Sequence, residues 1–132
     1  MQYVNPAALA DPRGYSNGVF LPAGAGAGVL MVSGQVGWNR EAHLVSDRFA
    51  DQFDQALANV LTVVSEAGGT AQSVAKLTIF VTDKAAYLEA RPEIGDKYKE
   101  RMGAHYPAMT LVEVKSLLEP GALVEIDAIA IV

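Results

Sequence analysis

The segment from Ala122 to Val132 (ALVEIDAIAIV) constrains the fold most, because it has the pattern of a strand that is apolar on both faces. Successive side chains of a strand point to opposite faces. A strand of this kind lies inside a sheet that is covered on both sides. One face would carry Val124, Ile126, Ala128, Ala130 and Val132, and the other Leu123, Glu125, Asp127, Ile129 and Ile131.

Two helical patterns stand earlier in the chain. Apolar residues recur at three- and four-residue spacing from Phe49 toward Gly69, which predicts a helix capped by Ser46 and Asp47 and ended by the Gly68-Gly69 pair. A second helical region is predicted from Lys84 to Met102. We expect it to be broken near Pro92, because proline fits the first turn of a new helix.

The remaining segments predict strands. An Ala/Gly run over 23–28 predicts a hairpin turn rather than a phosphate loop, because the segment that follows it is strand-like and not helical. Pro120-Gly121 marks a turn between the last two strands. The predicted strands span 19–22, 29–33, 74–82, 108–115 and 122–132, with a short opening strand at 2–5.

This order predicts a single α+β domain over 1–132, with one mixed sheet and both helices packed on one face. Two helices cover only one face of that sheet. A soluble monomer rarely exposes a large apolar patch, so we expect the second face to pack against another copy of the chain. The sequence therefore predicts a homo-oligomer.

Composition narrows the classes of partner. The net charge is −5 and the sequence pI about 4.9, which disfavours a nucleic-acid partner because phosphate binding needs a basic surface. The chain has no cysteine and no apolar stretch near the roughly 20 residues that span a bilayer. Its first residues lack the pattern of an export signal, so a cytoplasmic protein without a membrane partner is expected.

Glu125 is the candidate catalytic residue, because it interrupts an apolar strand. A buried carboxylate must be paired, hydrogen-bonded or protonated, and burial raises its pKa toward the range useful for proton exchange with water. The alternative is a structural glutamate paired with a lysine or an amide. Glu113 and Asp127 have weaker claims. We expect no metal, because neither histidine has ligand spacing with an acid, and no cofactor.

A second group of candidates lies at the ends of the hairpin strands. Tyr15 with Ser16, and Ser33 with Gly34 and Gln35, stand where side chains and free amides can line a cleft. A serine hydroxyl and an adjacent N–H could bind a ligand's oxygen. The alternative is an ordinary transition from strand to turn.

Six segments in order resemble the Rid/YjgF family of reactive-intermediate imine deaminases, also known as L-PSP endoribonucleases. They are GYSNGV at 14–19, VLMVSGQVG at 29–37, the 49–69 helix, VAKLTIFVTD at 74–83, YPAMTLVEV at 106–114 and ALVEIDAIA at 122–130. The resemblance covers essentially the whole chain. It implies a homotrimer of chorismate-mutase-like subunits with small-molecule sites at the subunit interfaces. It also implies hydrolysis of enamines and imines of the 2-aminoacrylate type.

The resemblance assigns roles to individual positions. Glu125 matches the acid that activates water, and Tyr15, Ser33 and Gly34 match residues that line the pocket. The arginine that binds the substrate carboxylate in active deaminases is Met109 here, and a frequent pocket cysteine is Leu111. A frequent asparagine falls at Gly95. Met109, Leu111 and Trp38 would make the pocket more apolar, although a tryptophan at the position of Trp38 is more often a loop anchor.

Three functions are compatible with these residues. The favoured one is an imine or enamine deaminase, or a related hydrolase, that acts poorly on 2-aminoacrylate and prefers an uncharged or larger substrate. The alternative is a trimer that binds a metabolite or regulates a partner without catalysis. Ribonuclease activity is the least favoured, because the chain is acidic and lacks a histidine-containing acid–base pair.

Overall fold

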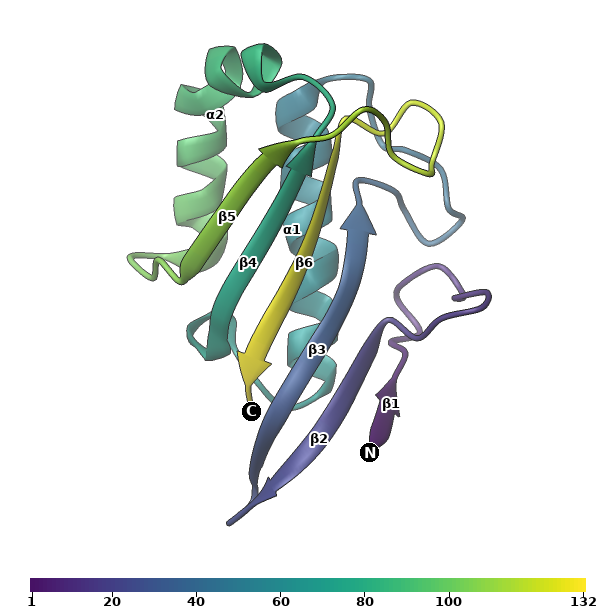
Figure 1. The fold of residues 1–132 in the computed structure, drawn as a ribbon, viewed down its shortest axis with the longest axis vertical. Helices are drawn as coiled ribbons and strands as arrows, with labels where there is room; N and C mark the ends of the chain where they lie inside the picture. The colour runs from purple at the N-terminus through teal and green to yellow at the C-terminus, as the bar shows by residue number, and fades with distance from the viewer.

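The computed structural model describes residues 1–132 as one mixed sheet with two long helices packed behind it (Figure 1). The sheet has six strands in the order β1-β2-β3-β6-β4-β5. Strands β4 and β5 are parallel, and every other neighbouring pair is antiparallel. The predicted single α+β domain, with both helices on one face, is confirmed.

The elements lie close to the predicted ranges. The strands are β1 (Gln2–Val4), β2 (Gly18–Gly24), β3 (Ala27–Val36), β4 (Val74–Val81), β5 (Ala108–Glu113) and β6 (Val124–Ile131). The helices are α1 (Phe49–Glu66) and α2 (Lys84–Met102), with a short 3-10 turn, η1 (Ala71–Ser73), before β4. The hairpin turn is tighter than predicted, with only Ala25 and Gly26 between β2 and β3, both at positive φ.

The predicted cap of α1 is wrong in detail. Arg48 occupies the N-cap position and makes no capping bond with its side chain. Ser46 lies two residues earlier, where its hydroxyl accepts the Arg48 N–H and donates to Asp51. Gln52 instead fixes this end of the helix. Its fully buried amide donates to the carbonyls of Ser46 and Gly121 and accepts the N–H of Leu123, so it ties α1 to the segment before β6.

The predicted break of α2 at Pro92 is also wrong, because the helix runs through the proline. Proline removes one helical hydrogen bond, to the carbonyl four residues earlier. That carbonyl belongs to Leu88, and both residues are exposed, so water reaches the carbonyl that the proline leaves without a partner. The helix begins at an Asp83 cap that accepts the amides of residues 85 and 86.

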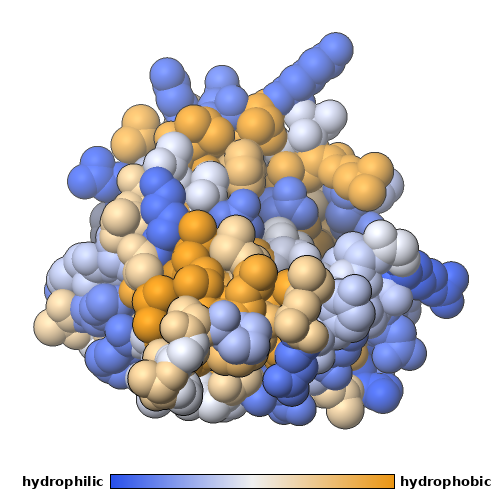
Figure 2. Space-filling view, turned by 60° about the horizontal axis from the view of Figure 1, so that its bottom comes forward, coloured by the Kyte–Doolittle hydropathy of each residue, from blue (hydrophilic) through white to orange (hydrophobic).

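The two faces of β6 differ as the alternation predicts. Val124, Ile126, Ala128 and Ala130 are buried in the core beneath the helices, while Glu125, Asp127, Ile129 and Ile131 lie on the face that no helix covers. Part of that open face is apolar, with Leu21, Met31 and Ile131 exposed on neighbouring strands. Figure 2 brings the hairpin end of the sheet forward and shows apolar side chains gathered there.

Neither helix is both long enough and apolar enough to cross a membrane.

Candidate active site

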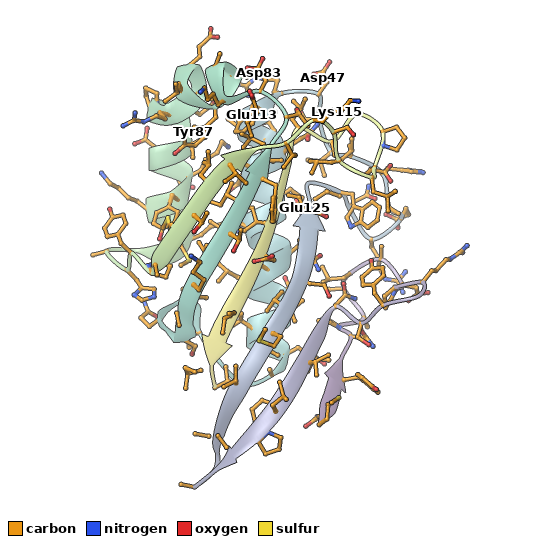
Figure 3. The ribbon with its side chains drawn as sticks, in the orientation of Figure 1. Asp47, Asp83, Tyr87, Glu113, Lys115 and Glu125 are labelled. Atoms are coloured by element: carbon orange, nitrogen blue, oxygen red, sulfur yellow. The ribbon has the colours of Figure 1, made fainter.

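A hollow of about 280 Å³ lies at the end of β3 and brings together five of the seven predicted site residues. Figure 3 shows Glu125 beside that end of β3. The hollow is lined by Tyr15, Ser33, Gly34, Val36, Trp38, Leu118, Glu119 and Glu125.

A β-bulge shapes the floor of this hollow. Val32 pairs with Ala128 and Gln35 with Ile126, so Ser33 and Gly34 together stand opposite a single residue of β6, Asp127. Bulges bend a strand and redirect side chains, and they are frequent beside active sites. Here the bulge brings the backbone of Gly34 against the carboxylate of Glu125.

Glycine at position 34 makes room for this contact. A Cβ there would lie 2.8 Å from Cδ of Glu125 and 2.9 Å from its Oε1, so a larger residue would displace the carboxylate. The backbone of Gly34 is not in the left-handed region, so the absence of a side chain matters here for the approach of the carboxylate and not for the turn. The Glu125 carboxylate therefore occupies the space of a missing side chain.

Burial raises the pKa of Glu125 above its ordinary value, and the negative charge of Asp127 adds to the rise. The pKa of Tyr15 is also raised, first by burial and then by the charge of Glu125. Each effect disfavours an additional negative charge in the hollow. Glu125 is thus the one carboxylate that lines the hollow with a raised pKa.

Polar side chains beneath the hollow hold the bulge in place. The Ser33 hydroxyl donates to the Ser16 carbonyl over 2.5 Å, so toward a ligand it offers an acceptor rather than a donor. Gln35 and Asn17 are both buried, and the Gln35 amide donates to the side-chain oxygen of Asn17 and to the Ser33 carbonyl, each over 3.2 Å. The side-chain nitrogen of Asn17 is buried without a partner.

Trp38 lines the hollow, and its backbone is paired with that of Leu44 through an isolated bridge. The Asn59 amide fixes the loop by donating to the carbonyls of Val36 and Trp38.

Three residues of the hollow were not predicted. Val36 follows from the length of β3, which extends three residues beyond the predicted strand. Leu118 and Glu119 come from the loop between β5 and β6, and Leu118 is fully exposed at the rim. In the sequence, only the position of Leu118 and Glu119 directly before the Pro120-Gly121 turn could have indicated them.

Met109 and Leu111 lie away from this hollow within one chain. Met109 pairs with Leu77 and Leu111 with Ile79, and paired residues of neighbouring strands share a face. Leu77 and Ile79 are buried beneath the helices, so Met109 and Leu111 are on the helix side, opposite Glu125. Met109 lines a second hollow of about 310 Å³ between β5 and α2, where Figure 3 also shows Tyr87. A site shared by Glu125 and Met109 therefore requires two copies of the chain.

No group of three or more histidine, cysteine or acidic side chains is arranged to hold a metal ion.

Residues 7–132 match the family described as Endoribonuclease L-PSP. The chain belongs to this family. The L-PSP family is the one whose members are also called Rid, YjgF and RutC proteins, so the family predicted from the sequence is confirmed.

Three members of the L-PSP family are similar to this chain in sequence or in structure. A RutC family protein of Aquifex aeolicus is 34% identical over 104 residues, which cover 79% of this chain and 81% of that protein. The human 2-iminobutanoate/2-iminopropanoate deaminase is 29% identical over 103 residues, covering 77% and 72%. The crystal structure of E. coli TdcF with bound serine has a TM-score of 0.82 and 25% identity, covering 100% of this chain and 99% of that one.

Proposed function

We propose that this chain hydrolyses a C=N bond of a small imine or enamine, with Glu125 as the general base. The observation that carries the proposal is the half-buried Glu125 carboxylate, with its raised pKa, held against Gly34 in a hollow beside Tyr15 and Trp38. The human relative named as a 2-iminobutanoate/2-iminopropanoate deaminase supports the reaction class.

The reaction needs only water and one proton carrier. Glu125 takes a proton from the water as its oxygen adds to the imine carbon. Glu125 returns this proton to the nitrogen to form a carbinolamine. It then carries the hydroxyl proton of the carbinolamine to the same nitrogen as the C–N bond breaks, so that both protons of the water leave with ammonia and a carbonyl remains. An enamine enters the same route after a proton reaches its β-carbon. The raised pKa of Glu125 suits it to carry both protons in turn.

We propose a homotrimer in which the Glu125 hollow of one copy faces the Met109 side of the next. The uncovered apolar residues Leu21, Met31 and Ile131 support an interface on the open face. Contacts between two different surfaces close into rings, which agrees with the trimer that the family resemblance implies.

The substrate differs from 2-aminoacrylate in this proposal. Met109 and Leu111 put apolar side chains where active deaminases of the family have an arginine and a cysteine, so the wild-type site favours an uncharged or larger molecule. Loss of a charged partner of this kind costs about 2–5 kcal/mol, or roughly 30-fold to several-thousand-fold in rate.

The test measures keto-acid release from 2-aminoacrylate generated in situ, and from larger imines. We expect slow turnover of 2-aminoacrylate by wild type, faster turnover by Met109→Arg, and loss of about 10²–10⁴-fold on every substrate with Glu125→Gln. Glu66→Gln is the matched control, because Glu66 is exposed at the end of α1. Turnover that survives Glu125→Gln would overturn the mechanism.

A non-catalytic, metabolite-binding trimer is the second candidate, because the hollow could bind a ligand without catalysing its reaction. It predicts neutral metabolites that raise the melting temperature without being consumed. Ribonuclease activity stays the least favoured despite the family's descriptive name, since the net charge of −5 opposes binding to RNA.

A further inference from the structure

The hollow between β5 and α2 carries positive charge only. Its ten lining residues include two cations, Arg91 and Lys99, and no carboxylate. A concave surface lined by one sign of charge attracts ligands of the opposite sign. This distinguishes it from the Glu125 hollow, whose ionisable side chains are acids and a tyrosine.

The two cations stand on one stripe of α2 with a glycine between them. Arg91, Gly95 and Lys99 are spaced four residues apart, so they lie one above another on the helix surface. A Cβ at Gly95 would meet no atom within 4 Å, so no neighbouring side chain requires glycine there. Glycine inside a helix costs about 0.5–1 kcal/mol relative to alanine. Its effect here is to leave open space between the two positive side chains.

Neither cation is engaged within the chain. The other basic residues of the central and C-terminal parts of α2 form ion pairs, Lys97 with Asp51 and Arg101 with Asp54, the latter through two bonds of 2.6 and 2.9 Å. Glu93 is two residues from Arg91, but its carboxylate binds Arg48 of the α1 N-terminus. The guanidinium of Arg91 and the ammonium of Lys99 therefore face the hollow without a partner.

The rest of the hollow is apolar and aromatic. Tyr98 and Tyr106 stack with their ring centroids 5.5 Å apart and their planes within 15°. The Tyr98 hydroxyl donates to the His105 carbonyl over 2.6 Å. Burial raises the pKa of Tyr98 to about 12. Met109 and Tyr87 complete the walls. Such a surface fits a flat apolar group of a ligand, and the two cations are the groups that can orient a polar part of the same ligand.

We propose that Arg91 and Lys99 bind the carboxylate of a substrate whose body is an apolar or aromatic group lying on Tyr98, Tyr106 and Met109. The inference rests on the proposed function and chooses between its two substrate classes: a larger, anionic molecule rather than an uncharged one. Arg91 and Lys99 are specificity-determining residues, and the Glu125 hollow of the neighbouring copy receives the reacting C=N group.

A binding experiment tests the anion site without requiring turnover. Calorimetry would compare 3-phenylpropanoate with its uncharged analogue, 3-phenylpropanamide. We expect wild type to prefer the carboxylate, and Arg91→Gln to weaken carboxylate binding about tenfold or more while leaving amide binding unchanged. Lys115→Gln is the charge-matched control, since Lys115 is exposed beyond β5. Equal binding of the two probes by wild type, or equal losses in Lys115→Gln, would overturn the proposal.

A mixing experiment separates this inference from the proposed reaction. The Arg91→Gln and Glu125→Gln variants are co-expressed in equal amounts so that they form mixed oligomers. If each site takes Arg91 from one copy and Glu125 from its neighbour, both residues are intact at about a quarter of the interfaces. We expect imine hydrolysis of an aromatic substrate to recover to about that fraction of wild type. Carboxylate binding without any turnover in wild type would refute the reaction and leave the anion site standing. Turnover that Arg91→Gln does not alter would refute the anion site alone.

Discussion

Replacing Gly34 with alanine should displace the Glu125 carboxylate and leave the fold intact. The added methyl would lie within 3.0 Å of Cδ, Oε1 and Cγ of Glu125, all of them atoms of one flexible side chain. Because residue 34 has a backbone conformation open to any amino acid, the substitution adds no φ strain. Moving Glu125 off its rotamer costs about 0.5–1.5 kcal/mol. A misplacement of about 1 Å can lower a rate about 10²-fold, which corresponds to roughly 2.7 kcal/mol of transition-state stabilisation.

Gly34→Ala should therefore lower kcat/KM for imine hydrolysis about 10²-fold while changing the free energy of unfolding by no more than about 1.5 kcal/mol. The control is a double-mutant cycle with Glu125→Gln. If Gly34 acts through the carboxylate, the alanine should cost far less in the Glu125→Gln background than in wild type. A Gly34→Ala protein with wild-type kcat/KM would refute the reasoning, as would losses that add fully in the double variant.

Two further predictions concern stability. Since burial and Asp127 raise the pKa of Glu125 in the folded chain, its contribution to stability is present below its unfolded pKa and is lost as pH rises through the folded pKa. The stability of Glu125→Gln relative to wild type should therefore increase in urea titrations as the pH rises from below 4.5, the ordinary pKa of this carboxyl, through its raised folded pKa; a relative decrease would contradict the raised pKa. Gln52→Leu should cost about 2–4 kcal/mol, because its three backbone partners lose their hydrogen bonds; a loss below about 0.5 kcal/mol in the same titrations would show that water replaces them.

The sequence predicts what depends on local periodicity. The alternation of β6 and the apolar spacing of α1 each follow from a repeat that one segment contains, so both were predicted with nearly the observed bounds. The predicted helix break at Pro92 is wrong because an exposed proline can lie inside a continuous helix, and the sequence does not show which side of α2 faces water. That information belongs to the tertiary structure.

The residues of the site likewise differ in whether a single segment of the sequence indicates their position. Glu125 could be predicted because a charge inside an apolar strand is visible in one segment. The bulge at Ser33 and Gly34, by contrast, arises from the register between β3 and β6, which no local pattern determines. The face of Met109 likewise depends on the parallel register of β5 with β4. A shift of one residue would turn Met109 to the open side, the face of the sheet that carries Glu125.

The sheet lies between the two hollows, so the proposed reaction depends on the proposed assembly of subunits. Glu125 lies on the open face and Arg91 on the helix side, so one substrate can touch both only between two copies that present different surfaces. The largest cause of the raised pKa of Glu125 is already burial within one chain. In the proposed trimer, covering of the hollow by a neighbouring copy would remove more water from the carboxylate, which raises its pKa, and would bring two cations toward the same space, which lowers it. In the proposed trimer, the proton affinity of Glu125 and the affinity for an anionic substrate would both depend on the contact between subunits.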